Sequence, residues 1–400
     1  MRYTDVAIIG GGLAGSTIAA ALGRDEIATI MIDPHPLYPT DLRCEKLGDS
    51  QIAILGKTGL ADSVLQTATL DGQVWIARFG YLIQKRASDQ HGILYDTLVN
   101  TIRGEIPPCV ETVTTKAIAV STSPNRQTVS LANGEEISAR LIVMATGLNI
   151  GIRHMLGLER DVVSECHSIT VAFDILPVGR SAFDFPALTY YPESSKDRAA
   201  YLTLFPIGDT MHANLMVYRS ADDPWLRQMR HEPEAALKVL MPRLHRITGD
   251  FKIAGPVKIR PADLYVTRGY RQHGVVLVGD AFATSCPAAG TGSDKVFTDA
   301  ERLCNVHIPN WLTTDGMAVE KIAEFYDDPV KVACDSWSTA KAYHLRALST
   351  DNGLPWRAGR WARFLARAAQ GRLDQARHAL GIGKRSAVDI EDRAQQGKLA

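Results

Sequence analysis

The sequence predicts an α/β protein in which a parallel-sheet domain is interrupted by an antiparallel-sheet domain and followed by a helical region. Three observations predict it: a strand, glycine-rich turn and helix at the N-terminus, long alternating strands after about residue 165, and a buried-type strand that resumes at Val275. The expected boundaries are 1–160 with 270–310 for the first domain, 165–268 for the second, and 311–400 for the helices and a frayed tail.

The N-terminal segment has the pattern of a dinucleotide-binding turn. Val6–Ile9 reads as a β-branched strand, residues 10–15 fit G-x-G-x-x-G, and Ser16–Leu22 favours a helix. A second predicted strand, at residues 27–32, ends at Asp33, roughly the twenty residues downstream at which an acid accepts ribose hydroxyls. The context of strand, turn, helix and acid makes the motif far more specific than glycines alone.

Each residue of this turn has a predicted role. Gly10 permits the tight turn, Gly12 lets the backbone approach a pyrophosphate, and Gly15 lets the helix, with Ala14 in its first turn, pack close to the strand. Asp33 alone also suits a turn, because prolines follow it. A secretory signal is the other reading of the apolar stretch, and three consecutive glycines argue against it.

The chain up to about residue 150 continues the first domain. Residues 34–48, with three prolines, predict a loop leading into a helix at 49–60, and Ser88–Gly92 precedes a periodic helix that Pro107 and Pro108 close. An Asn-Gly hairpin and a buried parallel strand follow, at Thr128–Leu131 with Ile137 and at Leu141–Ala145.

Long alternating strands characterise the second domain. Their predicted ranges are Thr170–Ile175, Leu188–Tyr191, Tyr201–Phe205 and His212–Arg219. Their aromatic residues are candidates either for a wall of a ligand site or for ordinary core: Tyr190, Tyr201, Phe205 and Tyr218.

A second glycine-rich stretch follows the strand that begins at Val275. Gly279-Asp280 ends this strand, and Pro287, Gly290 and Gly292 precede a helix running to about Cys304. A helix N-terminus of this kind favours anions, and one sheet can bring both glycine motifs to the carboxyl ends of its strands.

Composition narrows the function classes. Residues are 46% hydrophobic, and 44 Lys plus Arg balance 44 Asp plus Glu, so nothing supports a nucleic-acid partner. Six cysteines without C-x-x-C or C-x-x-H spacing predict free thiols in a reducing cytoplasm and no metal site. No apolar run approaches the length of a membrane span, which predicts a soluble or at most peripheral protein.

These motifs resemble the FAD-dependent class A aromatic monooxygenases, the para-hydroxybenzoate hydroxylase-like flavoproteins. The resemblance spans roughly residues 4 to 305 and implies an FAD-binding Rossmann-like domain of the glutathione-reductase type with an inserted antiparallel β-sheet substrate domain. It implies FAD contacts at Gly10, Gly12, Ala14, Gly15, Asp33, Arg43, Gln90, Gly147, Gly279, Asp280, Pro287, Gly290 and Gly292.

Two departures bear on the electron source. Thr146-Gly147 stands where the family usually has Asp-Gly, and Ala281-Phe282-Ala283 replaces the common Ala-Ala-His after the Gly-Asp motif. The first departure is more similar to flavoenzymes that receive electrons from a separate reductase. Whether NAD(P)H reduces the FAD directly is therefore left open.

The reaction that the resemblance implies inserts one oxygen atom from O₂ into an aromatic or other electron-rich substrate, through a flavin C4a-hydroperoxide. The substrate is a small molecule, free or bound to a carrier.

Alternatives are a geranylgeranyl-reductase-like reductase or dehydrogenase, a non-enzymatic flavin-binding accessory protein, and a halogenase. The halogenase signature Trp-x-Trp-x-Ile-Pro is absent after Trp75. No catalytic residue is assigned, because each candidate has a plainer role: His154, His167, His212, Lys46 and Cys286.

The C-terminal helix predicted at Leu354–Leu380 is basic and amphipathic. Arginines recur at three- and four-residue spacing beside Trp361, Phe364 and Leu365. Its apolar stripe either packs on the FAD domain, or docks an anionic surface such as a membrane, an acidic carrier or a reductase.

Overall fold

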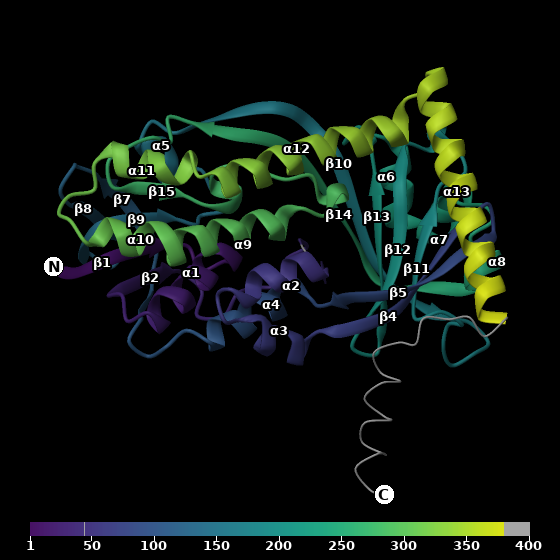
Figure 1. The fold of residues 1–400 in the computed structure, drawn as a ribbon, viewed down its shortest axis with the longest axis horizontal. Coiled ribbons are helices and arrows are strands. Elements are labelled where there is room, and N and C mark those ends of the chain that lie inside the picture. Colours follow the sequence, from purple (N-terminus) through teal and green to yellow (C-terminus); the bar gives the residue numbers. More distant parts are fainter. Residues whose placement is uncertain (44, 380–400) are drawn as a thin grey trace, which may run out of the picture.

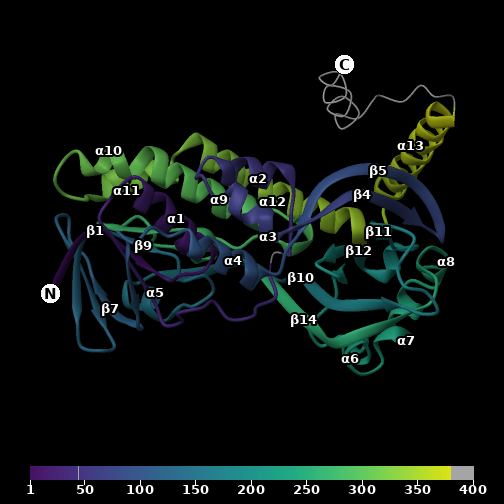
Figure 2. The same cartoon turned by 90° about the horizontal axis from the view of Figure 1, so that it is seen from below.

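The computed structural model describes residues 1–43 and 45–379, and its two β-sheets lie side by side along the long axis of the molecule (Figure 1). The predicted frayed tail lies outside the described residues. Helix α12 (Pro329–Thr350) runs over both sheets and ends near α13 (Leu354–Ala379), at the far side of the second sheet (Figures 1 and 2). No helix in the described part of the chain is both long and apolar enough to cross a membrane.

The first sheet has seven strands and a parallel centre. β1 (Arg2–Ile9) pairs in parallel with β2 (Thr29–Asp33) and β9 (Glu136–Met144), so the ends of these strands lie at one edge. The outer strands are β6 (Glu111–Thr114), β7 (Ala117–Ser121), β8 (Gln127–Leu131) and β15 (Val275–Leu277). The hairpin predicted around the Asn-Gly turn is β8–β9, and β9 continues without a break through the predicted strand at Leu141–Ala145 as far as Met144.

Helices cover this sheet and bury a core of aliphatic side chains from its strands, including Ile8, Ile142 and Val276. The helices of this half are α1 (Leu13–Arg24), α2 (Asp49–Gly56), α3 (Ala61–Thr67), α4 (Tyr95–Gly104), α5 (Gly151–Met155), α9 (Gly292–Arg302), α10 (Ile308–Leu312) and α11 (Val319–Tyr326).

The second sheet has eight strands in the order β14-β10-β13-β12-β11-β4-β5-β3. All pairs are antiparallel except β4 with β11. The strands are β3 (Lys46–Leu47), β4 (Thr69–Arg78), β5 (Tyr81–Gly92), β10 (Glu159–Pro177), β11 (Ala187–Tyr191), β12 (Ala199–Ile207), β13 (Thr210–Val217) and β14 (Phe251–Arg268).

Residues 69–92 differ from the sequence expectation. They form β4 and β5 and extend the second sheet, whereas Ser88–Gly92 was expected only to precede a helix. The charged, exposed residues Lys85 and Arg86 interrupt the apolar alternation of β5, so its sequence lacks the usual strand signal. Its pairing with β4 and its cover by α13 define it instead.

The two faces of the second sheet have different neighbours. One face carries Leu188, Leu204 and Leu215 and packs on α6 (Pro224–His231) and α7 (Pro233–Leu240). The small helix α8 (His245–Thr248) follows them. The opposite face carries Met216 and Tyr218 and packs on residues 286–289 and on α12. This second face therefore adjoins the glycine-rich stretch of the first half.

Candidate functional site

The first glycine turn connects β1 to α1 as predicted. Gly10 has a φ of +104°, and a Cβ there would lie 2.5 Å from the carbonyl oxygen of Ala145. A Cβ at Gly15 would lie 1.8 Å from the oxygen of Gly10, so a side chain would push the helix off the strand. At Gly12, the N-cap of α1, a Cβ would meet only Tyr38 at 3.7 Å. The α1 N-terminus, which includes Ala14 and no acidic residue, is thus suited to a phosphate.

Asp33 lies beside this turn at the end of β2. One carboxylate oxygen accepts the Gly11 backbone N–H at 2.7 Å, and the other accepts the His35 N–H at 2.9 Å. The acid and the glycine turn, 22 residues apart in sequence, are therefore in direct contact.

Arg103, at the end of α4, is a member of this group that sequence reasoning missed. Its guanidinium lies 3.2 Å from Asp33, and it donates to the carbonyl oxygens of Gly11 (2.8 Å) and His35 (2.7 Å). It ties α4 to the glycine turn and balances the acid's charge. The only signal in the sequence is a basic residue in the last turn of a helix, which is common for dipole reasons alone.

Arg43 and Asp280 join the loop after β2 to the second glycine motif. The Arg43 guanidinium contacts an Asp280 oxygen at 2.6 Å, although 237 residues separate them, and its Nε donates to Asp41, also at 2.6 Å. Burial would lower the pKa of Arg43, but the neighbouring Tyr95, Asp280 and Asp41 raise it above its ordinary value. A charged arginine at this position can neutralise a pyrophosphate.

Buried polar groups hold the Gly279–Ala281 turn from both sides. Gly279, with a φ of +56°, donates its N–H to Asp299 at 2.9 Å, and Lys331 of α12 pairs with the other Asp299 oxygen at 2.7 Å. On the far side, Arg153 donates to the carbonyl oxygens of Ala281 at 2.7 Å and Gly147 at 3.2 Å.

Arg153 thereby positions the Gly147 turn next to the Asp280 turn. Its side chain is only 1% exposed, so it makes these contacts from the protein interior. Burial lowers the pKa of this guanidinium.

The segment from Pro287 to Gly292 faces the second sheet. Pro287 opens a short turn, Gly290 adopts a φ of +64°, and α9 begins at Gly292. Gln51 of α2 donates to the Gly290 carbonyl at 3.0 Å, and Tyr201 of β12 donates through its hydroxyl to the Ala288 carbonyl.

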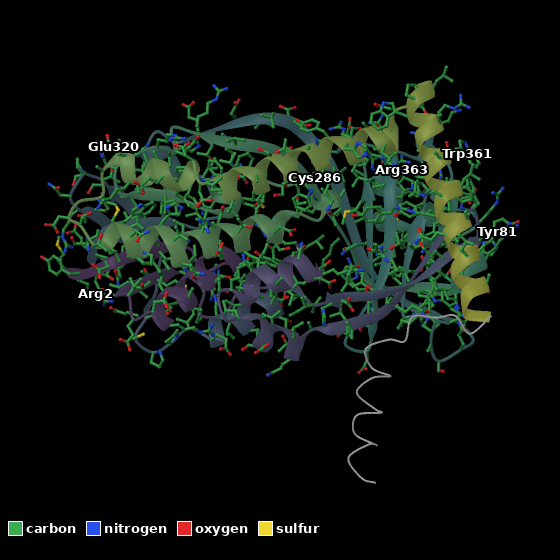
Figure 3. The ribbon with its side chains drawn as sticks, viewed as in Figure 1. Arg2, Tyr81, Cys286, Glu320, Trp361 and Arg363 are labelled. Carbon is green, nitrogen blue, oxygen red and sulfur yellow. The ribbon has the colours of Figure 1, made fainter. Side chains whose placement is uncertain are left out.

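The aromatic wall is partly as expected. Tyr201 and Tyr218 belong to the cluster that contains Cys286, whereas Tyr190 is buried on the opposite face with Leu188 and Leu204. The interpretation of Tyr190 as a wall residue is therefore wrong, because the strand alternation of β11 turns it toward α6 and α7. Cys286, labelled in Figure 3, is 1% exposed, and burial raises the pKa of its thiol.

Gln90 lies slightly apart from the other predicted cofactor residues. It is on β5, where its side-chain oxygen accepts from Lys46 Nζ at 3.1 Å, and its amide nitrogen lies 3.9 Å from the position of a Cβ on Gly48. Gln90 also lines a cavity of about 260 Å³ between the second sheet and α13.

Two of the remaining acid-base candidates, His212 and Lys46, have structural partners. His212 on β13 is held between Asp174 at 2.7 Å and Glu45 at 2.9 Å. Burial alone would lower its pKa, but the hydrogen bonds to Asp174 and Glu45 raise the pKa of His212 to about 9. Lys46 pairs with Asp71 at 3.2 Å.

Comparison with known proteins identifies the family. A family described as "FAD binding domain" matches residues 3–308. The chain belongs to this family. It is 26% identical over 335 residues to the 3-demethoxyubiquinol 3-hydroxylase of Escherichia coli K12, covering 76% of this chain and 79% of that protein. It is 25% identical over 324 residues to the 3-amino-4-hydroxybenzoate 2-monooxygenase PtmB3 of Streptomyces platensis, covering 74% and 77% respectively.

A solved structure with a similar fold is also a monooxygenase by name. The crystal structure of p-nitrophenol 4-monooxygenase PnpA from Pseudomonas putida DLL-E4 superposes with a TM-score of 0.72 at 17% identity, covering 94% of this chain and 98% of that one. The α/β FAD-binding fold, the cofactor FAD and membership of the FAD-dependent monooxygenases, which are oxidoreductases, are thus shown.

The residues present fit FAD. The open backbone at Gly12, the acid Asp33 and the arginine Arg43 supply donors and acceptors for an adenosine pyrophosphate. Asp280 offers a carboxylate for sugar-like hydroxyls at the other end of the same group.

Proposed function

We propose that this chain uses FAD and O₂ to hydroxylate a small aromatic ring that carries an electron-donating substituent. The observation that supports this most is the contact of Arg43 with Asp280, because it joins the loop after β2 to the turn that precedes the segment facing the second sheet. The contact of Tyr201 with the Ala288 carbonyl extends that arrangement to the sheet on which a substrate would lie.

In this proposal, different predicted residues bind different parts of FAD. Gly10, Gly12, Ala14 and Gly15 form the α1 N-terminus that receives the pyrophosphate, with Asp33 on the ribose and Arg43 on the phosphate charge. Gly279 and Asp280 bind the ribityl and pyrophosphate part, and Pro287, Gly290 and Gly292 lie beside the isoalloxazine ring. Gln90 and Gly147 are the remaining proposed FAD contacts. When bound, FAD supplies the two-electron activation of O₂ and the transfer of one oxygen atom.

The protein contributes a dry, oriented environment. Met216, Tyr218 and Leu264 are buried beside Cys286 and exclude water from the space in front of residues 287–292. The N-terminus of α9 presents backbone N–H groups that stabilise negative charge there.

The substrate class follows from the relatives. Two act, by name, on 3-demethoxyubiquinol and on 3-amino-4-hydroxybenzoate, and a solved structure with the same fold acts on p-nitrophenol. Each ring carries an oxygen substituent, so we propose a phenol or aminophenol for this chain.

We further propose that a separate reductase delivers the electrons. Thr146 stands where the resembling family has an aspartate, and its hydroxyl donates to the nearby Asn149 carbonyl at 3.2 Å. The position thus provides no carboxylate with which to organise a nicotinamide.

The function is tested with the FAD-loaded protein, a flavin reductase with NADH, and a panel of phenols and aminophenols. Substrate-dependent O₂ uptake with a hydroxylated product supports the proposal. Reoxidation of the reduced FAD by a substrate in the absence of O₂ supports the reductase alternative, and no turnover of any substrate supports the accessory protein.

We propose, as a separate point, that α13 contacts an anionic membrane surface. Trp361, Leu365 and Leu373 are 54%, 61% and 59% exposed, and Arg357 and Arg372 flank them (Figure 3 labels Trp361). Pelleting with phosphatidylglycerol vesicles is expected for the parent and lost in Trp361→Ser/Leu365→Ser. The control Val239→Ser removes an apolar side chain of α7 that is even more exposed, at 72%. Unchanged pelleting of the double variant, or equal binding to neutral vesicles, contradicts the contact.

A further inference from the structure

The cavity that Gln90 lines is built largely from the face of the second sheet that adjoins the glycine-rich segment. β4, β5 and β11 form its floor, and α13 closes one side. At about 260 Å³, it is slightly smaller than the usual range for drug-sized ligands, so it suits a ligand of one or two rings. The residues important for its chemistry are Val74, Ile76, Arg86, Gln90, Tyr191 and Arg367.

The cavity is positively charged. Arg86 of β5 and Arg367 of α13 both line it, and no carboxylate does among the described residues. Arg367 lies 5.1 Å from the centre of the Tyr191 ring. Within the described part of the chain, neither guanidinium has an ion-pair or hydrogen-bond partner, so both are available to an anion.

Apolar and aromatic groups accompany the charges. Val74 and Ile76 are almost fully buried side chains of β4, and Tyr191 offers the face of an aromatic ring. A ligand with an apolar body and one anionic end matches this arrangement, because the body would cover Val74 and Ile76 while the anion meets the two arginines.

Two of the residues that line the cavity are linked through their neighbours to the segment at residues 287–292 and to α2. The rings of Tyr191 and Tyr201 meet edge to face with centroids 6.5 Å apart, and Tyr201 donates to the Ala288 carbonyl. On the other side, Gln90 is bonded to Lys46, two residues before Gly48 at the N-cap of α2.

We propose that this cavity is the carboxylate subsite of the substrate pocket, in which Arg86 and Arg367 bind the acid group of an aromatic acid. This rests on the proposed function only in naming the ligand a substrate. The planar guanidinium groups suit a carboxylate, which each can bind through paired N–H donors. The C-terminal helix is thereby a part of the substrate site as well as an outer layer.

Binding can be measured without turnover, by isothermal titration of the FAD-loaded full-length protein. The probes are benzoate, salicylate and anthranilate, each compared with its neutral amide. We expect at least one acid to bind at least tenfold more tightly than its amide. Arg86→Gln and Arg367→Gln should each weaken that acid at least tenfold, leaving FAD content and affinity for the amide unchanged.

Two control variants lie close by in the fold. Lys85→Gln alters the neighbouring cation on β5, which lies over Trp75, and Arg363→Gln alters the α13 arginine one turn away, which contacts His344. Both should bind the acid as the parent does. The subsite is overturned if no acid binds, if acid and amide bind equally, if inorganic phosphate binds more tightly than every acid, or if the controls weaken binding as much as the two test variants.

The result is separable from the proposed reaction. Arginine-dependent binding of an acid together with no O₂-dependent hydroxylation would leave the subsite standing and refute the reaction. Hydroxylation of neutral phenols, together with acid binding that neither Arg86→Gln nor Arg367→Gln weakens, would support the reaction and refute the subsite.

Discussion

At the scale of single residues, Gly12 and Gly15, which flank Leu13-Ala14, are required for different reasons. Gly15 is required by packing, because its Cβ would lie 1.8 Å from the Gly10 oxygen, whereas a methyl at Gly12 has room in the protein and would project where phosphate is expected. Fold and cofactor binding should therefore be separable at these two positions.

We expect Gly12→Ala to fold with nearly the parent's stability but to lose most of its FAD, and Gly15→Ala to unfold or to be destabilised by several kcal/mol. Flavin absorbance per chain and thermal unfolding of the apoprotein measure both effects. Retention of FAD by Gly12→Ala would show that the α1 N-terminus does not hold the phosphates.

His212 makes a pH-dependent contribution to stability. Its pKa is raised to about 9 in the folded protein from an ordinary 6.5, so the protonated form stabilises the fold fully below about pH 6.5 and the contribution is lost as the pH rises through 9. Relative to His212→Gln, the parent should lose roughly 3 kcal/mol of unfolding free energy between these limits. Denaturant titrations at pH 6 and 9.5 test this, and parallel pH profiles for the two proteins would contradict it.

Residue-level prediction succeeded where local sequence carries the signal. Gly10, Gly15 and Asp33 are recognisable because strand, turn and helix lie within thirty residues. Arg103 and Arg153 act on backbone carbonyls of other segments, and no spacing rule identifies such contacts. Whether the predicted residues bind FAD stays a prediction.

At the scale of elements, α9 and α12 are joined by buried charge beneath the Gly279 turn. Lys331, 1% exposed, pairs with Asp299 and with Asp335, and Asp299 also accepts the Gly279 N–H. Removal of the lysine would leave buried carboxylates without their cation, which is costly in a low-dielectric interior.

We therefore expect Lys331→Met to lower the free energy of unfolding by about 3–5 kcal/mol. Chemical denaturation of the apoprotein measures this. The exposed pair Arg271 and Asp327 provides a control, since Arg271→Met should change stability by less than about 1 kcal/mol. Equal effects of the two substitutions would argue against the role of the buried pair.

Helices and strands were predictable where a short run of sequence carried the apolar pattern typical of the element. The parallel strands and the hairpin at the Asn-Gly turn follow from short runs, but β5 carries charge on consecutive residues and was missed. The C-terminal helix was predicted, and it packs on the hairpin of β4 and β5, which lies within the residues assigned from sequence to the FAD domain but extends the second sheet. Phe79, at the β4–β5 turn, contacts Trp361 and Phe364 of α13, and Arg367 reaches Tyr191.

At the scale of the whole molecule, the two sheets meet where residues far apart in sequence converge. The ends of the predicted parallel strands already indicated that both glycine motifs could lie at one sheet edge, and the long alternating strands between the motifs indicated the second sheet. β4 and β5 belong to the N-terminal part of the chain but extend the second sheet, so the two halves are interleaved rather than consecutive (Figure 2). The domain boundaries proposed from sequence stay a prediction.

The electron source is testable at this scale. Because position 146 is a threonine, we expect NADPH alone to reduce the bound FAD slowly, and a flavin reductase with NADH to restore fast reduction. Anaerobic stopped-flow absorbance at the flavin band follows both. Rapid bleaching by NADPH without a partner would return the protein to the one-component monooxygenases.

The central claim, oxygen insertion by bound FAD, is tested most directly by turnover under ¹⁸O₂ in ordinary water. The FAD-loaded protein, supplied with a reductase, NADH and an accepted aromatic substrate, should yield a product that contains one ¹⁸O atom, with the second atom of O₂ released as water. A hydroxylated product that contains oxygen from water only, or a reduced product with no oxygen added, would contradict the account.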